Sequence, residues 1–220
     1  MGVASVLAGR CECEFCRQGL TTALHSDPSH DQRLAQDFVV GGATLHILGG
    51  TTKCARVTLA YALAHPHVFA GKRVLELGSG AGLLAIGLAV GLGCTVDATD
   101  QEPVLDLLNA NIAANTDSAR HKVRASTLQW GEGLDDWRGK HDLVVGTDLN
   151  FARENLAPLC ATIDALVATP AQALILASIR RATWEQALFE SLATAFEVEV
   201  LLDAGDVQVQ RFVRRSKPPT

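Results

Sequence analysis

Apolar positions follow two different patterns along most of this chain. Short, nearly continuous apolar runs are typical of buried strands, and the longer segments between them carry apolar residues every three or four positions, as on one face of a helix. In 103–115, for example, Val104, Leu107, Leu108 and Ile112 share one helical face. Strands are predicted over 73–77, 95–99, 122–128, 142–148 and 172–178, and helices over 82–92, 103–115, 155–168 and 182–195.

The two ends of the pattern depart from this alternation. Short apolar runs on either side of Gly41-Gly42 predict an N-terminal hairpin, and a helix is predicted to follow over 51–64. Near the C-terminus, the runs 196–202 and 207–213 are separated by only a few residues, which predicts a second hairpin. We therefore expect an α/β fold with a doubly wound seven-strand sheet whose last strand is antiparallel.

Composition places the chain among ordinary globular proteins. Of its 220 residues, 48% are hydrophobic and 20% are charged, which suits one α/β domain with a full core. Residues 1–35 are expected to form an irregular N-terminal segment, and 36–220 the domain, as a monomer. The net charge of −5 argues against nucleic-acid binding. The uncharged stretch 77–96 is long enough to span a bilayer, but its six glycines favour a turn, a helix and a strand, so no membrane contact is expected.

Cysteines indicate the compartment. Cys11, Cys13 and Cys16 form a C-x-C-x-x-C cluster in the N-terminal segment, and the other three cysteines lie singly. This spacing is not a disulfide framework, so a reducing cytoplasmic location is expected, with the nucleus as an alternative. The cluster could hold zinc if His25 or His30 supplied a fourth ligand, but free thiols are the preferred interpretation and no metal is predicted.

The stretch 74–83 combines a short apolar strand, an acid and three glycines. Gly78, Gly80 and Gly82 let the chain turn sharply into the following apolar helix, whose first amides can face a ligand. A second strand ends eighteen residues after Gly82 in Asp100, where a carboxylate suits the hydroxyls of a ribose. The pattern predicts a nucleoside-containing cofactor, and the alternative is a tight turn with no ligand. The spacing differs from the G-x-G-x-x-G of dinucleotide sites.

Several motifs resemble those of one enzyme family. The segment Glu76-x-Gly78-x-Gly80-x-Gly82 resembles motif I of S-adenosylmethionine-dependent methyltransferases with a seven-strand sheet. Asp148-Leu-Asn-Phe151, Trp130-Gly131 and the segment 101–111 resemble motifs of the cytosolic branch that methylates proteins, mostly on lysine, and carries D-x-x-Y/F after its fourth strand. The resemblance extends from about Thr52 to the C-terminus.

The resemblance implies S-adenosylmethionine as cofactor and assigns its contacts. Glu76, Gly78, Ser79 and Gly80 are expected at the amino-acid part of the cofactor, and Asp100 at the ribose. Trp130 is expected against the adenine, although its alternative role is core packing. Thr147 is expected to line the pocket. The family's tryptophan at the start of the helix before the first sheet strand is missing here, where the sequence is Thr52-Lys-Cys-Ala-Arg56.

The resemblance also assigns the residues that face the substrate. Asp148 is expected to orient the target amine, and Phe151 to pack along the lysine stem, as the two catalytic residues. Asp148 could instead cap the following helix, and Phe151 could be a core residue. Asn150 and Phe151 replace the family's commoner apolar residue and tyrosine.

We therefore expect an enzyme that transfers a methyl group from S-adenosylmethionine to a side-chain nitrogen of a protein substrate, with lysine as the expected target residue. One alternative is a small-molecule N-methyltransferase of the same fold. The others are an NAD-dependent oxidoreductase, against which the glycine spacing argues, and an inactive binding module that retains the cofactor turn.

Overall fold

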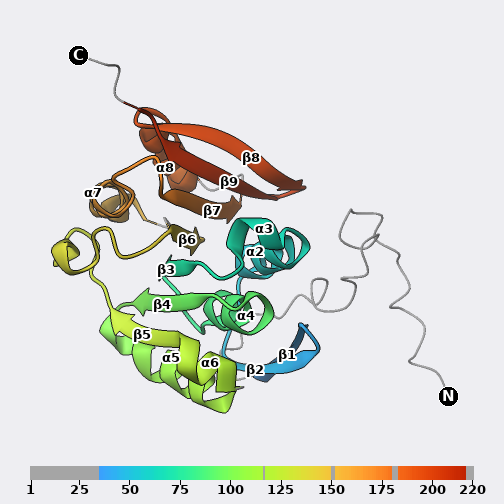
Figure 1. Cartoon of the computed structure of the whole chain (residues 1–220). Coiled ribbons are helices and arrows are strands. Elements are labelled where there is room, and N and C mark those ends of the chain that lie inside the picture. Colours follow the sequence, from blue (N-terminus) through green and yellow to red (C-terminus); the bar gives the residue numbers. More distant parts are fainter. Residues whose placement is uncertain (1–34, 116, 150–151, 180–182, 217–220) are drawn as a thin grey trace.

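A computed structural model describes residues 35–115, 117–149, 152–179 and 183–216 (Figure 1). The cysteine cluster at positions 11–16, Asn150 and Phe151 therefore lie outside the described residues, and the expectations for them stay predictions. None of the described helices is long and apolar enough to cross a membrane.

Seven strands form the central sheet, in the order β5-β4-β3-β6-β7-β9-β8. Six of them run parallel, and β9 lies antiparallel between β7 and β8. The expected seven-strand sheet with an antiparallel last strand is confirmed. The strands are β3 (Arg73–Leu77), β4 (Thr95–Asp100), β5 (Val123–Thr127), β6 (Leu143–Thr147), β7 (Ala173–Ile179), β8 (Phe196–Ala204) and β9 (Val207–Arg214).

Helices cover both faces of this sheet, with α2 and α4 on one side and α7 on the other in Figure 1. Each face encloses its own apolar cluster: one joins α2, α4 and α5 to the sheet, and the other joins α7 and α8 to it. The long helices are α2 (Lys53–Ala64), α4 (Leu83–Leu92), α5 (Glu102–Ala114), α7 (Leu156–Leu166) and α8 (Thr183–Ala193). Short helical turns are α3 (Pro66–Phe69), α6 (Asp117–Lys122), η1 (Leu134–Asp136) and η2 (Arg153–Asn155).

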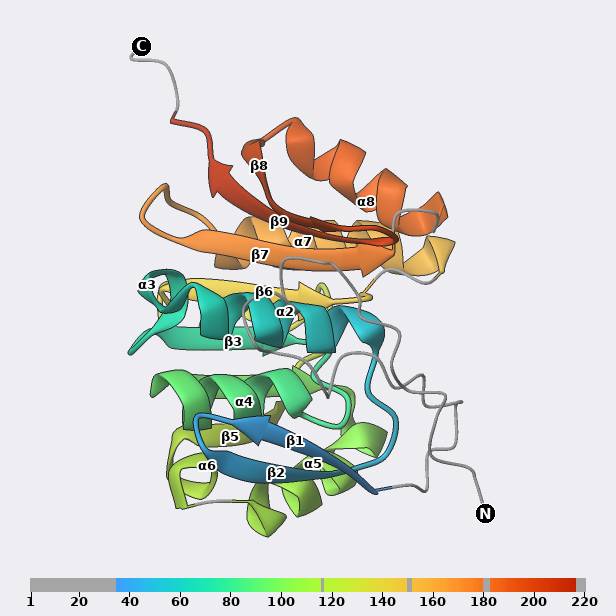
Figure 2. The same ribbon diagram turned by 90° about the vertical axis from the view of Figure 1, so that its right-hand side faces the viewer.

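The predicted N-terminal hairpin is present as β1 (Ala35–Val40) and β2 (Ala43–Leu48). Its inward-facing side chains, Phe38, Val40, Leu45 and Ile47, are buried. Figure 2 shows the hairpin beside α4 and α5, on the same side of the sheet as α2. The hairpin therefore adds a cover over α4 and α5 rather than an eighth strand of the sheet.

Helix α4 is apolar on all sides because it is enclosed. Leu83, Leu84, Ile86 and Leu88 are each at most 2% exposed. A Cβ at Gly87 would lie 2.5 Å from Leu59 Cδ1 of α2, so this glycine lets the two helices approach closely. The enclosure explains why an apolar stretch of this length belongs to a globular core rather than a bilayer.

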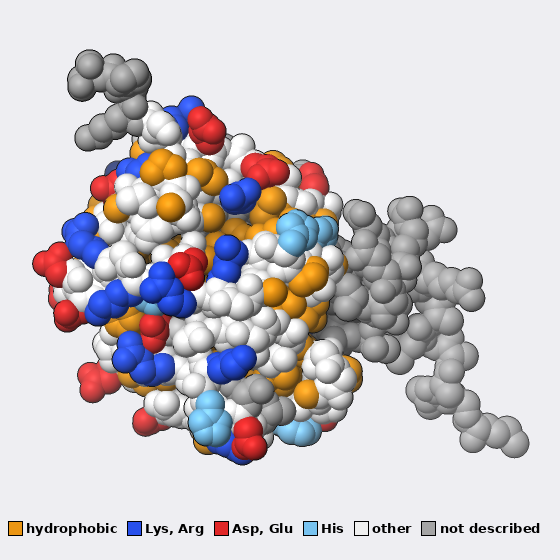
Figure 3. All heavy atoms as spheres, viewed as in Figure 1, with side chains coloured by type: hydrophobic (Ala, Val, Ile, Leu, Met, Phe, Trp, Pro, Cys, Tyr) orange, Lys and Arg blue, Asp and Glu red, His pale blue; other side chains and the backbone are white. Residues whose placement is uncertain are grey.

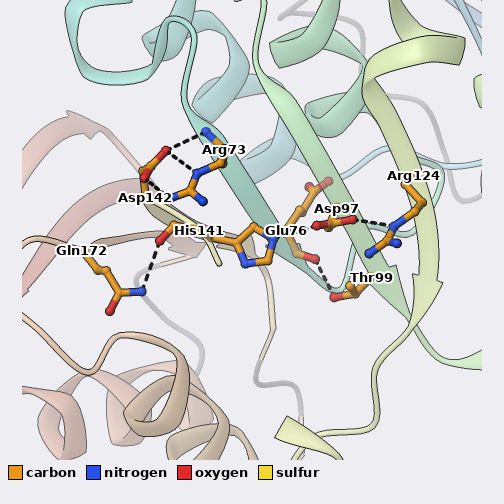
Figure 4. Close-up of polar contacts among 8 residues, drawn as sticks. All are labelled: Arg73, Glu76, Asp97, Thr99, Arg124, His141, Asp142 and Gln172. Atoms are coloured by element: carbon orange, nitrogen blue, oxygen red, sulfur yellow. Dashed lines mark hydrogen bonds and ion pairs between the residues drawn. The ribbon is translucent and has the colours of Figure 1, made fainter. Parts of the chain in front are cut away.

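Polar contacts tie the strands together at the amino ends of β3 and β6. Arg73 Nη2 donates to Asp142 Oδ1 over 2.7 Å, and hydrogen bonds from Arg73 hold the pKa of Asp142 at about 2 (Figure 4). Buried His141 lies 2.7 Å from Asp97 Oδ2, and Arg124 Nε donates to Asp97 Oδ1 over 2.8 Å. Figure 3 shows many Lys and Arg side chains on the molecular face turned to the viewer of Figure 1, interspersed with acids. The contacts of Asp142 and Asp97 therefore brace the end of the sheet that is remote from the glycine turn.

Candidate active site

The glycine turn joins β3 to α4 and requires its three glycines. The backbone φ angles are 64° at Gly78, 53° at Gly80 and 84° at Gly82, all in the left-handed region that side chains with a Cβ rarely adopt. The turn also has no space for a side chain at two of these positions. A Cβ at Gly82 would lie 2.5 Å from Leu108 Cδ1, and one at Gly78 would lie 2.9 Å from Leu149 Cδ2.

Neighbouring β4 holds the middle of this turn through backbone and carboxylate contacts. Ser79 N donates to the Thr99 carbonyl over 2.9 Å, and Gly80 N donates to Asp100 Oδ2 over 2.8 Å. Asp100 Oδ1 accepts from Gln101 N over 2.7 Å. Asp100 therefore braces the turn in addition to its predicted role toward a ribose, and each carboxylate oxygen keeps a lone pair for a further donor.

Glu76 is buried in the middle of the sheet directly before the turn. The residue is only 2% exposed, and Thr99 Oγ1 donates to its backbone carbonyl over 2.7 Å (Figure 4). Burial raises the pKa of Glu76 from 4.5 to about 8, an effect that the nearby Ser79 hydroxyl and Ala85 amide oppose and the charge of Asp100 reinforces. A buried carboxyl whose pKa is raised this far is typical of a ligand site.

The polar atoms at the turn fit the amino-acid part of S-adenosylmethionine. Glu76 Oε2 and Ser79 Oγ are buried, and although the two side chains are close enough for the hydroxyl to act on the Glu76 pKa, neither atom has a partner in hydrogen-bond geometry among the described residues. Buried polar atoms in native proteins are almost always paired, so the two oxygens indicate a ligand that donates hydrogen bonds. A Cβ at Gly80 would meet nothing within 4 Å, which leaves open space beside the same turn.

Asp148 lies at the carboxyl end of β6 in a strained backbone conformation. Its φ is 53°, the only positive value among the described residues other than glycine. Its amide donates to the Ala177 carbonyl over 3.0 Å, which holds this residue against neighbouring β7. The conformation is one that Asp and Asn tolerate better than other residues, and strain of this kind concentrates at functional sites. The helices that follow have Ala152 and Asn155 as their N-caps, so the alternative role of Asp148 as a helix cap is wrong.

The residue directly after Asp148, Leu149, lies in the core. Leu149 is 3% exposed and packs over two glycines, one in β6 and one in the glycine turn. Its side chain occupies the space where a Cβ of Gly146 or Gly78 would lie. Leu149 therefore connects the predicted substrate motif to the cofactor turn by direct packing.

Replacing Gly146 with alanine is expected to destabilise the protein by about 1–3 kcal/mol, because the new Cβ would lie 2.4 Å from Leu149 Cδ1 and 3.0 Å from its Cγ. Chemical denaturation measures the loss. Gly50→Ala is the matched control, since a Cβ there meets nothing within 4 Å. In a double-mutant cycle with Leu149→Ala, the two losses should be less than additive, and full additivity would contradict the packing argument.

The remaining predicted residues lie at the same edge of the sheet. Thr147 ends β6 and is 8% exposed. Trp130 follows β5, is partly exposed, and packs with one side against the apolar cluster of α7. Its expected contact with adenine stays a prediction. Because β4, β3 and β6 are neighbours in the sheet, their carboxyl ends bring Asp100, Glu76 and Asp148 to one edge of the sheet at the reversal of strand order, where such sheets bind ligands.

Sequence reasoning missed three residues that shape this site. Thr99 holds β3 through the carbonyl of Glu76, Leu149 packs beneath the turn, and Asn111 of α5 donates to the Ala81 carbonyl over 2.8 Å. Asn111 and Leu149 lie within segments that resemble family motifs, 101–111 and 148–151, but the resemblance assigned no role to either side chain. Contacts between distant segments carry no local periodicity, so the pattern gave no role for any of the three.

Comparison with known proteins identifies the family. The model of the lysine methyltransferase family matches residues 47–195. Protein N-lysine methyltransferase METTL21A of Danio rerio is 40% identical over 148 residues, which are 66% of this chain and 67% of that protein. EEF1A lysine methyltransferase 3 of Mus musculus is 28% identical over 190 residues, or 86% of this chain and 79% of that protein. Protein-lysine N-methyltransferase EFM3 of Chaetomium thermophilum is 37% identical over 120 residues, 50% of this chain but only 36% of that protein.

Solved structures agree on the fold. The chain aligns with the 16S rRNA N2 G1207 methyltransferase of T. Thermophilus, in complex with AdoMet and guanosine, at a TM-score of 0.60 and 20% identity, covering 86% of this chain and 52% of that chain. A glycopeptide N-methyltransferase complexed with S-adenosyl-L-methionine aligns at a TM-score of 0.55 and 14% identity, covering 70% and 94%. The family match, together with this fold, confirms the predicted enzyme class and cofactor: the chain belongs to the lysine methyltransferase family and is an S-adenosylmethionine-dependent methyltransferase.

Proposed function

We propose that this protein transfers the methyl group of S-adenosylmethionine to the ε-amine of a lysine in a partner protein, at the edge of the sheet that carries the glycine turn and Asp148. The observation that carries the proposal is that a buried carboxyl and a residue with a left-handed backbone lie at the same ends of two adjacent strands. Glu76, with its unpaired buried oxygen, precedes the turn on β3, and Asp148, with its left-handed backbone, directly follows β6. Leu149, the residue after Asp148, packs against Gly78 of the turn, so the two features belong to one site.

The residues of the turn bind the cofactor, which supplies an electrophilic methyl group on a sulfonium. Glu76 and Ser79 accept hydrogen bonds from its amino group, and the open space at Gly80 admits its chain. Asp100 accepts from the ribose hydroxyls, Trp130 covers the adenine face, and Thr147 lines the pocket.

Asp148 acts on the substrate side. Its carboxylate accepts a hydrogen bond from the lysine amine and orients the lone pair toward the methyl group, since an in-line displacement depends mainly on such alignment. Phe151 would pack along the lysine stem, three positions further along the chain. The amine must arrive neutral, and no metal is needed for the displacement.

Labelling tests this function directly. The purified protein is incubated with methyl-labelled S-adenosylmethionine and a cell lysate, and the labelled product is hydrolysed and analysed for methyllysine. We expect a labelled protein band that yields methyllysine, without nucleic acid or membranes being required, in a cytoplasmic or nuclear extract. Label found only in small molecules would favour the alternative of a small-molecule enzyme. Gel filtration checks the expected monomer.

Replacing Asp100 with alanine is expected to weaken binding of S-adenosylmethionine by roughly 1–3 kcal/mol, because hydrogen bonds from the ribose to a charged group are lost. The Gly80 amide also loses its acceptor, so the turn loosens. Isothermal titration calorimetry measures the change. Asp106→Ala is the control, since Asp106 is exposed on α5. An unchanged affinity in Asp100→Ala would exclude Asp100 from the cofactor site.

A further inference from the structure

Asn111, on α5, is a buried amide that joins two segments far apart in the sequence. It is 2% exposed, and its Oδ1 accepts from Leu48 N over 2.9 Å. Its Nδ2 donates to the Leu48 carbonyl and to the Ala81 carbonyl, each over 2.8 Å. Leu48 ends the hairpin strand β2, and Ala81 lies inside the glycine turn between Gly80 and Gly82. One side chain therefore fastens the hairpin to the turn.

Asn115 forms the same kind of contact one helical turn later. Its Oδ1 accepts from His46 N over 2.9 Å, and its Nδ2 donates to the His46 carbonyl over 2.9 Å. Four residues along a helix rise about 6 Å and two residues along a strand rise about 6.6 Å, so amides spaced by four can pair with alternate residues of a strand. The two asparagines thus take the place of a neighbouring strand at the edge of β2.

The two asparagines differ in their third hydrogen bond. The remaining donor of Asn115 reaches the Asn111 carbonyl of its own helix over 2.6 Å, whereas that of Asn111 reaches the turn. The face of α5 that carries Asn111 also places Leu108, which is fully buried, against Gly82. Asn111 is therefore the polar part of a contact that sets the position of the turn.

The segment after Leu48 continues this connection. Gln36 Nε2 donates to the Gly49 carbonyl over 2.9 Å, and Thr51 Oγ1 donates to Gln36 Oε1 over 3.0 Å. The Thr52 side chain then accepts from Ala55 N at the start of α2. Hydrogen bonds at four of the five residues from Leu48 to Thr52 thus hold the hairpin exit and the start of α2, and Asn111 links this segment to the cofactor turn.

We propose that Asn111 is a positioning residue for the cofactor, which couples the β1–β2 hairpin to the turn that binds S-adenosylmethionine. The proposal rests on the cofactor site described above. Asn111 itself touches no cofactor in this scheme. It holds the Ala81 carbonyl, and hence the amides on either side of it, in the geometry that the ligand needs, and binding of the ligand in turn stabilises the hairpin contact.

Paired variants test this role. Asn111→Ala and Asn115→Ala each remove one amide pair with β2, so both are expected to lower the melting temperature. Only Asn111→Ala leaves the Ala81 carbonyl without its partner, and it is expected to raise the Kd and the KM for S-adenosylmethionine about tenfold, the size of one buried hydrogen bond. The kcat at saturating cofactor should stay within about twofold of wild type, since no group that faces the substrate is changed.

Equal effects of the two variants on cofactor affinity would overturn the proposal and leave Asn111 with a structural role only. Failure of the wild-type protein to bind S-adenosylmethionine would instead contradict the proposed function, so the two failures are distinct. A hydrogen-exchange measurement on the wild-type protein is a second test, and it does not depend on whether either variant folds. With saturating S-adenosylhomocysteine, exchange at the Leu48 amide is expected to slow, and an unchanged rate there would also overturn the coupling.

Discussion

Replacing Asp148 with asparagine is expected to lower methyl transfer about a hundredfold, a loss of roughly 2.7 kcal/mol in transition-state stabilisation. The hydrogen bond from the amine to a carboxylate becomes stronger as positive charge develops on the attacking nitrogen, so its loss acts mainly on the transition state. The rate at saturating substrate should therefore fall more than the affinity for the cofactor. Single-turnover measurements with labelled S-adenosylmethionine and the identified protein substrate give the rate, and calorimetry gives the affinity.

Asparagine is the informative replacement because the backbone at position 148 is left-handed, with φ of 53°. Asn adopts this region readily, whereas alanine would add strain and confuse the chemical effect with a folding effect. Asp142→Asn is the matched control: it makes the same change in the residue before the opposite end of β6, where the carboxylate pairs with Arg73. The control should keep full activity. A fully active Asp148→Asn enzyme would show that this carboxylate does not orient the substrate.

The protein without cofactor is expected to lose stability as the pH rises from about 4.5 to about 8, because Glu76 is buried. Its pKa is 4.5 before burial and about 8 in the fold, so the native state holds a proton that the unfolded chain releases. The stabilisation is fully present below the unfolded pKa and is lost as the pH rises through the folded pKa. Between pH 4 and pH 9 the difference amounts to roughly 4–5 kcal/mol. Denaturation at several pH values measures it.

The variant Glu76→Gln keeps the shape of the side chain and removes the titration. It should be nearly as stable as wild type near pH 4 and more stable than wild type at pH 9, with a correspondingly flatter profile between. Other groups titrate equally in both proteins, so the difference between the two profiles isolates Glu76. Identical profiles would contradict the assigned pKa.

Cofactor binding should reverse this preference for the neutral carboxyl. The ammonium of S-adenosylmethionine favours the carboxylate form of Glu76, so binding at pH 7 should release close to one proton. Calorimetry in buffers of different ionisation enthalpy detects this release. Affinity should rise with pH up to about 8, the folded pKa, and Glu76→Gln should bind more weakly without this dependence. A wild-type affinity that does not change over this range would exclude Glu76 from contact with the amino group.

Local pattern was sufficient for most of the fold because the strands are short apolar runs and most of the long helices carry apolar residues at helical spacing. The predicted strand over 73–77 and the hairpin of 196–202 with 207–213 correspond to β3 and to β8 with β9. The short helix α6 was not predicted, since Asp117, Arg120, His121 and Lys122 give it almost no apolar side to recognise. The sequence likewise indicated the glycine turn, Asp100 and Asp148, because each lies in or beside a short motif at the end of a predicted strand.

What the sequence determined by itself is the class of fold, the place of the cofactor turn and the identity of the acids near it. What only the tertiary structure decided is how these parts act on one another. Strand β9 enters between β7 and β8, Leu149 fills the space left by Gly78 and Gly146, and Asn111 joins the hairpin to the turn. Burial, which raises the pKa of Glu76, is likewise a property of the surroundings. The physical reason is common to all of these: contacts across long sequence distances depend on how whole elements pack, and a local pattern of apolar and polar residues records only which side of each element is buried.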